Sequence, residues 1–330
     1  MKAVVITRFG GPEVLEIHDV PTPQPGPDKV LVQVRGSALN RADLLQRAGR
    51  YAAPAGAPEN IPGLEFAGEV FEMGANAHRW RKGDRVMGIA GGGAHAEFLT
   101  AHQDTLVAVP PNLEWSAAGA VPEVFITAHD ALRQAAFKAG ENVLIHAVGS
   151  GVGLAATQLV KALGGRAFGT SRTPDKTERA KAFGLESGFT VADTSFLTGL
   201  SSFAKDVTSG AGFDVVLDLN GGPYFAASLE AMALKGRVIL IGGVAGGKAE
   251  VDLYQILGKR LHVIGTVLRA RSLQEKIAIT GTFGQEVVPL LASGSIEPVI
   301  DSVFPIEKIA DAHRRLESNE TFGKVVLTIS

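Results

Sequence analysis

A glycine-rich turn near the middle of the chain constrains its fold more than any other feature. The apolar run Asn142–Ala147 is a strand pattern, the glycines Gly149, Gly151 and Gly153 follow it, and Val152–Leu163 then has helical spacing. Glycines there permit a tight turn and let the backbone approach a pyrophosphate, which the N–H groups and positive dipole end of a helix N-terminus attract. The spacing departs from a strict G-x-G-x-x-G string, so the strand before it and the helix after it carry the interpretation. A dinucleotide site is predicted, with a purely structural glycine turn as the alternative; the predicted cofactor-binding residues of this turn are Ser150, Gly151, Val152 and Gly153.

From about Glu123 onward, strand and helix patterns alternate. Strands that are apolar along their whole length are typical of a parallel sheet covered by helices on both faces. We therefore expect a Rossmann-type, doubly wound α/β domain over residues 123–266. Its further predicted elements are the strands Arg166–Ser171, Phe213–Leu219 and Arg237–Ile241, a helix starting near Pro174 and a helix over Tyr224–Leu234.

Residues 1–122 have a different texture, with short strands separated by Gly and Pro, and predict an irregular, mainly β domain. Residues 267–330 mix two helices, Ser272–Ile279 and Glu286–Ala292, with short strands that end in Lys324–Ile329, and we expect them to return to the first domain. A length of 330 residues suits two domains. The strands predicted in the first part are Lys2–Arg8, Val14–Asp19, Val30–Ala38, Ala67–Met73, Arg85–Ile89 and Ala94–Thr100.

The end of the second strand of the α/β region indicates which dinucleotide is bound. Sites for NAD usually place Asp or Glu about 20 residues after the glycine turn, where it holds the ribose 2′-hydroxyl. Here Arg172 stands at that place, flanked by Ser171 and followed by Lys176, and together they form a plausible cradle for a 2′-phosphate. Asp175 argues against this, but an acid also suits the first turn of the next helix. NADPH is the predicted cofactor, with a solvated basic helix start as the alternative.

Composition excludes several other classes of function. A cysteine count of zero rules out disulfides and thiolate metal sites. The only dense group of histidines and carboxylates is His95, Glu97, His102 and Asp104, which lacks the helical spacing of a zinc motif, so we expect no metal. A net charge of −2 gives no reason to expect nucleic acid or a membrane surface as a partner. With neither a signal-peptide pattern nor a membrane-length apolar run, a cytoplasmic location is expected.

Landmark motifs occur in order along nearly the whole chain: Ser37–Asp43, Tyr51, Gly63–Glu65, Gly83–Asp84, Pro122–Glu123 with Thr127–Ala128, Leu268–Arg269 and Gly323–Val326. With them the sequence resembles the zinc-independent quinone oxidoreductases of the medium-chain dehydrogenase/reductase superfamily. The resemblance implies a GroES-like catalytic domain with an inserted Rossmann domain, and an interdomain cleft that holds the nicotinamide. It also implies a homodimer formed through edge strands of the Rossmann sheets; here the candidate edge is His262–Leu268, although a buried final strand would look the same in sequence.

Departures from the zinc-bearing alcohol dehydrogenases of this superfamily bear on the chemistry. Leu64 stands where those enzymes have a liganding His, and Asn40 where they have a liganding Cys. The cysteine-rich loop of their structural zinc is also missing. Without a Lewis acid an alcohol is hard to ionise, whereas a quinone or enone accepts hydride readily and its developing oxyanion can be met by hydrogen bonds.

The resemblance also assigns roles to individual residues. Tyr51 would donate to the substrate oxygen, Asn40 would lie near nicotinamide and substrate, and Thr127 would support the nicotinamide; the alternatives are a packed loop aromatic, a turn asparagine and a helix-surface or capping threonine. At Val191, relatives place a tyrosine near the adenosine. The remaining cofactor-binding residues implied are Gly242, Gly243, Leu268 and Lys324, with Arg269 and Arg271 closing over the cofactor unless they form a solvated basic face.

The leading hypothesis is an NADPH-dependent quinone oxidoreductase that transfers hydride from nicotinamide to a quinone in the interdomain cleft, without zinc. A second hypothesis is an NADPH-dependent reductase of α,β-unsaturated ketones or aldehydes, which would use the same cleft. A third is an NADPH-binding protein with a structural or regulatory role and little turnover.

Overall fold

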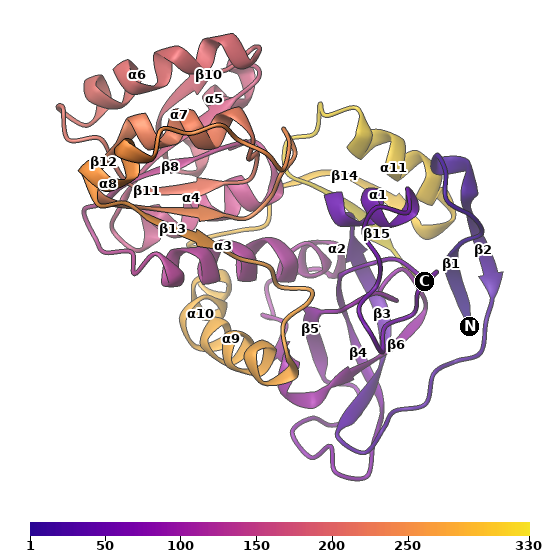
Figure 1. Ribbon diagram of the computed structural model, residues 1–330. Coiled ribbons are helices and arrows are strands. Elements are labelled where there is room, and N and C mark those ends of the chain that lie inside the picture. The colour runs from indigo at the N-terminus through magenta and orange to yellow at the C-terminus, as the bar shows by residue number, and fades with distance from the viewer. The chain divides into compact units, whose positions relative to one another are not determined.

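The computed structural model describes residues 1–330, which form two compact units (Figure 1). Unit 1 comprises Met1–Ile126 and Leu268–Ser330, and unit 2 comprises Thr127–Val267. The first boundary between the units along the chain, between Ile126 and Thr127, falls within the helix α3 (Pro122–Gln134).

Unit 2 is built on one six-stranded parallel sheet. Its central strands consist almost entirely of buried apolar residues, as expected of a sheet covered on both faces. The strands are β8 (Asn142–Ile145), β9 (Arg166–Ser171), β10 (Leu185–Thr190), β11 (Phe213–Asp218), β12 (Met232–Leu240) and β13 (His262–Gly265). The helices are α4 (Gly151–Ala162), α5 (Pro174–Ala180), α6 (Leu200–Val207), α7 (Pro223–Ala231) and α8 (Leu253–Lys259).

The strand order β10-β9-β8-β11-β12-β13 confirms the predicted doubly wound fold. The chain reverses its winding direction at β8, which has β9 on one side and β11 on the other. In open α/β sheets, ligands bind outside the carboxyl ends of the strands at this switch point. The predicted glycine turn follows β8 and therefore lies at that place. At one end of the sheet, β13 is the outermost strand, so the predicted edge is confirmed.

Two elements of unit 2 differ from the sequence prediction. The helix expected over Tyr224–Leu234 ends at Ala231, because Met232 already pairs with Phe213 and β12 begins there. A register shift follows, and Lys235 adopts a positive φ of 62° within it. The outer strand β10 was not predicted at all, because only Leu185 of its residues is buried and its sequence lacks an apolar run.

Unit 1 is mainly β, with a two-stranded and a seven-stranded sheet. The larger sheet has the order β14-β15-β3-β4-β5-β7, and β6 also pairs with β3. Its strands are β3 (Lys29–Ala38), β4 (Glu65–Met73), β5 (Arg85–Ile89), β6 (Phe98–His102), β7 (Leu106–Ala108), β14 (Ile300–Pro305) and β15 (Lys324–Thr328), and the small sheet pairs β1 (Lys2–Ile6) with β2 (Leu15–Asp19). The helices are α1 (Arg41–Arg47), α2 (Trp115–Gly119), α9 (Leu273–Glu286), α10 (Val288–Ala292) and α11 (Ile309–Glu317).

The strand predicted over Ala94–Thr100 begins later, at Phe98. The residues before Phe98 make other backbone hydrogen bonds. The N–H of His95 donates to Pro62 O, and the carbonyl oxygen of His95 accepts from Val4 N. These bonds attach the segment to β1 and to the stretch that precedes β4.

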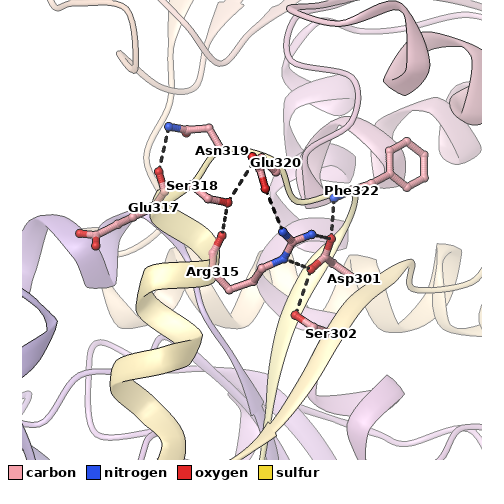
Figure 2. Close-up of polar contacts among 8 residues, drawn as sticks. All are labelled: Asp301, Ser302, Arg315, Glu317, Ser318, Asn319, Glu320 and Phe322. Carbon is pink, nitrogen blue, oxygen red and sulfur yellow. Dashed lines mark hydrogen bonds and ion pairs between the residues drawn. The ribbon is translucent and has the colours of Figure 1, made fainter.

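A partly buried ion pair, in which the Arg315 and Asp301 side chains are 35% and 7% exposed, fixes the loop that leads into β15 (Figure 2). Arg315 of α11 donates two hydrogen bonds of 2.9 Å to the carboxylate of Asp301 in β14, which also accepts from the backbone N–H of Phe322 at 2.9 Å. The next residue, Gly323, has a φ of 98°, and a Cβ there would come within 2.2 Å of Val299 O. Only glycine suits this position. The loop therefore delivers Lys324, the first residue of β15, in a fixed place.

Candidate functional site

Unit 1 holds a buried polar cluster centred on the ammonium group of Lys324. Its Nζ donates to Leu39 O at 2.7 Å and to Asn40 Oδ1 at 2.6 Å, and lies 2.7 Å from Glu65 Oε1. An ammonium has three protons to donate, so these oxygens use its full capacity. The side chains of Lys324 and Glu65 are 5% and 0% exposed, and burial without such partners would be costly. The structure thus places Lys324 as an internal partner of Asn40 and Glu65.

Asn40 is held from both sides of its amide. Its Oδ1 accepts from Lys324, and its Nδ2 donates to Glu65 Oε1 at 2.9 Å. Its backbone N–H donates to Asp43 Oδ2 at 2.8 Å in the first turn of α1, and Asp43 Oδ1 accepts from Gly63 N at 3.0 Å. These contacts bring Asn40 and Lys324 together and join them to the Gly63–Glu65 stretch singled out in the sequence.

Glu123 also joins this cluster, although the sequence indicated it only as a landmark. Its backbone N–H donates to Glu65 Oε2 at 2.8 Å, which places the start of α3 against the buried ion pair. Burial, with the Glu65 carboxylate as the next largest cause, raises the pKa of Glu123 to about 8. The Glu123 carboxyl group is therefore largely protonated at neutral pH and able to donate a proton.

Tyr51 lies against a second buried cation of unit 1, Arg269. The guanidinium carbon of Arg269 is 4.9 Å from the centroid of the Tyr51 ring, which is within cation–π range. Burial raises the pKa of the Tyr51 phenol, and the positive charge of Arg269 opposes this shift. Arg269 is only 6% exposed, so it does not belong to a solvated basic face.

In unit 2, the turn between β8 and α4 has the geometry of a phosphate-binding turn. Ser150 is the N-cap of α4, and its Oγ accepts from Gly153 N at 3.1 Å. A Cβ at Gly153 would come within 2.6 Å of Ala147 O, so glycine is required for this close approach. The N–H groups of the first turn of α4 have no acceptor within their own helix and can bind an anion. These residues fit the pyrophosphate of a dinucleotide.

Lys176 of α5 reaches back to this turn. A Cβ on Gly149 would come within 2.9 Å of Lys176 Cδ, so the lysine stem packs directly over Gly149. Ser171 ends β9, and its Oγ accepts from Thr173 N at 3.3 Å, which shapes the turn that carries Arg172. Ser171 at the end of β9, Arg172 in the connection and Lys176 in α5 are thus close together in the chain, and Lys176 contacts the glycine turn.

Tyr224 is a residue of this region that sequence reasoning missed. Burial raises the pKa of its phenol and the charge of Arg172 opposes the shift, so the two side chains are electrostatically coupled. Tyr224 packs with Val191 and Leu197, and its ring meets the ring of His146 edge-on at 5.1 Å between centroids. An aromatic side chain from α7 therefore lies beside Val191, where relatives were expected to carry a tyrosine.

The remaining residues named from the sequence lie in both units. Thr127 lies on α3 in unit 2 and is 8% exposed. Gly242 follows β12, and a Cβ there would come within 2.6 Å of Leu219 O; Gly243 is next in the loop. Leu268 belongs to unit 1 and is 6% exposed.

No helix is long and apolar enough to span a membrane. No group of three or more His, Asp or Glu side chains is arranged to hold a metal ion.

The folds of the two units and the glycine turn after β8 are those of a class of nicotinamide-dependent oxidoreductases, and comparison with known proteins agrees. Residues 26–111 match the family model of the alcohol dehydrogenase GroES-like domain, and residues 192–327 match that of the zinc-binding dehydrogenases. The chain is 30% identical to a quinone oxidoreductase of Homo sapiens, covering 100% of this chain and 98% of that protein. It is 32% identical to a quinone oxidoreductase of Pseudomonas aeruginosa, covering 99% of each.

A solved mycobacterial structure, complexed with NADPH, superposes with a TM-score of 0.87 at 28% identity, covering 99% of this chain and all of that one. The chain belongs to the medium-chain dehydrogenase/reductase superfamily, among relatives named quinone oxidoreductase. The family resemblance, the GroES-like domain and the Rossmann-type sheet predicted from the sequence are thereby confirmed.

Proposed function

We propose that this chain is an NADPH-dependent quinone oxidoreductase that works without zinc. The observation that carries the zinc-free part is the Asn40–Glu65–Lys324 cluster. Asn40 and Leu64 occupy positions at which zinc-bearing relatives have ligands, and the ammonium of Lys324 lies 2.6 Å from Asn40 Oδ1. The ammonium already fills the place beside Asn40 Oδ1 that a dication would need.

The groups of unit 1 suit a conjugated carbonyl acceptor. NADPH supplies the hydride, and the acceptor must also take up a proton, so that a quinone, NADPH and one proton give a hydroquinone and NADP⁺. The Tyr51 phenol is a hydrogen-bond donor for the oxygen on which negative charge develops. The Glu123 carboxyl group, whose pKa is raised to about 8, is a proton donor for that oxygen at neutral pH.

The preference for NADPH rests on Arg172 and Lys176, which would hold the 2′-phosphate through charge-assisted hydrogen bonds. The double variant Arg172→Ala/Lys176→Ala should raise the KM for NADPH by at least about 10- to 100-fold, since even one such bond is worth about 1.5–3 kcal/mol and about 1.4 kcal/mol corresponds to a factor of ten. The KM for NADH should change by less than about twofold. Steady-state kinetics with both cofactors measure this.

A matched control is Arg179→Ala, which removes a cation from the same helix, where Arg179 pairs with Asp175 on an exposed surface. It should leave both KM values near wild type. Equal losses with NADPH and NADH in the double variant would refute the assignment of the 2′-phosphate site.

The proposed activity is tested by assaying purified protein with 1,2-quinones, 1,4-quinones and enones, each with NADPH and NADH. Quinone turnover that exceeds enone turnover, in protein that metal analysis finds free of zinc, is the expected result. Stoichiometric zinc whose removal abolishes turnover would overturn the zinc-free mechanism. Preferred turnover of enones would favour the second hypothesis, a reductase that delivers hydride to carbon. Tight NADPH binding without turnover would favour the third, a structural or regulatory protein.

We further propose that the chain forms a homodimer through β13. This outer strand has one edge without a neighbouring strand, and Val263 is 42% exposed on it. In the same unit, α8 has no buried residue and exposes Leu253, Tyr254 and Leu257 by 64%, 80% and 68%. An open strand edge and exposed apolar side chains are features of a surface that pairs with another chain.

A further inference from the structure

Arg269 is a buried cation whose hydrogen bonds end on uncharged oxygens. Its Nε donates to Gly91 O at 2.8 Å and its Nη2 donates to Gln46 Oε1 at 2.7 Å. Its Nη1 is buried and has no hydrogen-bond partner. Buried arginines are rare unless they are paired with an acid, so this side chain calls for a reason. Stability alone does not supply one, because an unsatisfied buried charged group is destabilising.

The guanidinium plane is held on two sides by rigid parts of unit 1. Gln46 lies on α1, is 3% exposed, and is itself fixed because its Nε2 donates to Glu59 O at 3.0 Å. Gly91 lies just after β5. Since a planar fork loses little freedom when two of its nitrogens are bound, the orientation of Arg269 is set before any ligand arrives.

The guanidinium carbon of Arg269 lies over the Tyr51 ring, 4.9 Å from the ring centroid. Tyr51 lies in a stretch without helix or strand, so its own backbone does little to orient the ring. Asp43 acts on Arg269 through its charge, as does Glu123 once it is ionised, whereas the hydrogen bonds of Arg269 go to Gly91 and Gln46. The positive charge of Arg269 is therefore available to groups near the Tyr51 ring.

We propose that Arg269 is a positioning residue for Tyr51: its plane orients the phenol, and its charge, which no hydrogen-bonded acid neutralises, favours negative charge on the oxygen that the phenol serves. The inference rests on the proposed function, in which that oxygen belongs to the acceptor. Preorganised charge of this kind acts mainly on the transition state, because negative charge on the acceptor oxygen grows during hydride transfer.

The test is a double-mutant cycle of Arg269→Met and Tyr51→Phe, with turnover of a 1,4-quinone as the readout. Arg269→Met should lower kcat by about 10- to 100-fold. This is at or below the roughly 100- to 1,000-fold loss in kcat that follows removal of one preorganised hydrogen-bond donor. In the Tyr51→Phe background the same change should lower kcat by less than about threefold, because the residue that it positions has already lost its hydroxyl. The KM for NADPH should change less than twofold in each variant. Arg269→Lys keeps the positive charge but loses the planar guanidinium that lies over the Tyr51 ring. The kcat of this variant should therefore lie between those of wild type and Arg269→Met.

A second readout needs no turnover. The chain has three tyrosines, so the ultraviolet titration of Tyr51 can be isolated by subtracting the curve of Tyr51→Phe protein from that of wild type. Arg269 and Glu123 are the charged groups that act on this phenol, Arg269 lowering its pKa and Glu123 raising it. Arg269→Met should therefore shift the titration of Tyr51 to higher pH. Arg50→Met, at an exposed cation next to Tyr51 in the chain, is the matched control and should shift neither kcat nor the titration.

Equal fold-losses from Arg269→Met with and without the Tyr51 hydroxyl, or an unmoved titration, would overturn the inference. If wild-type protein reduces neither quinones nor enones, the proposed function fails, while the titration still decides whether Arg269 acts on Tyr51. If Arg269→Met does not fold, Arg269→Lys serves as the test. If this variant keeps both the kcat and the Tyr51 titration of wild type, the planar guanidinium does not orient the phenol.

Discussion

Among single residues, Glu123 is the one whose protonation state departs furthest from that of the free side chain. Its raised pKa, about 8, means that the folded chain holds a proton that the unfolded chain releases above about pH 4.5. The free energy of unfolding therefore falls as pH rises from about 4.5 to about 8 and is unaffected by this group at higher pH. Since one pKa unit corresponds to about 1.4 kcal/mol, the effect of this one carboxyl group is measurable.

Glu123→Gln should remove this dependence. Relative to wild type, the variant should gain about 1–3 kcal/mol of unfolding free energy between pH 5 and pH 8.5, allowing for partial exposure of the site. Denaturant unfolding at the two pH values measures the gain. Glu72→Gln, at an exposed site on β4, controls for the loss of a carboxylate as such. A difference between Glu123→Gln and wild type that is the same at both pH values would show that the carboxyl group is ionised in the folded chain.

The sequence indicated Asn40, Tyr51 and Lys324 as candidate site residues but did not indicate their partners. The contact between Asn40 and Lys324 joins residues 284 positions apart, and no local pattern encodes such a distance. The sequence left open that Arg269 belongs to a solvated basic face, because residue type alone does not show whether an arginine is buried or exposed. The glycine turn was easier to predict, since its strand, turn and helix are adjacent in the chain and each has its own signal.

Among the elements, β14, α11 and β15 are tied together by the ion pair of Asp301 and Arg315 (Figure 2). Burial alone would raise the pKa of Asp301, yet hydrogen bonds from Arg315, Phe322 N and Ser302 outweigh it and hold the pKa below its ordinary value. A lowered carboxyl pKa stabilises the fold above the pKa of the unfolded chain, about 4, and this contribution is lost as pH falls through the folded value.

Asp301→Asn should therefore lower the free energy of unfolding by about 1–3 kcal/mol at pH 7, because it removes the charge that pairs with Arg315 and replaces one of the two acceptor oxygens by an NH2 donor. Thermal and denaturant unfolding measure the loss. The matched control is Asp311→Asn on α11, whose pair with Arg314 is about half exposed and should be worth less than about 1 kcal/mol. Equal losses in the two variants would mean that the Asp301 pair is no more than a surface contact.

The elements differ in how well the sequence predicted them, for a physical reason. Most residues of the central strands β8 and β11 are apolar, because both faces of the sheet are covered. Such an apolar run can be recognised in the amino-acid sequence. At the outer strand β10 the burial that creates the pattern is missing. At the junction of α7 and β12, an apolar run continues across the boundary, and pairing with β11 decides where the helix ends.

The proposed dimer is a property of the whole molecule. Val263→Lys places a charge on the open edge of β13, where the side chain is already 42% exposed, so the fold should tolerate it. The mass measured by light scattering after size exclusion should fall from that of a dimer to that of a monomer. Phe196→Lys, at another exposed apolar site of unit 2, should leave the mass unchanged. An unchanged mass for Val263→Lys would exclude β13 as the interface.

The division of unit 1 into two chain segments has a consequence for how a ribosome makes this protein. By the time β13 has been synthesised, every strand of the unit 2 sheet exists, whereas β3 must wait for β15, some 286 residues after Ala38. At about 5–20 residues per second, this wait is about 15–60 s, during which the Gly36–Ala38 end of β3 lacks the partner on its second edge, because β6 covers only Lys29–Gln33 there. This part of β3 is open to aberrant strand pairing during that wait, and slower translation should prolong its exposure. The ammonium that completes the Asn40–Glu65–Lys324 cluster is added only at the end of the same wait.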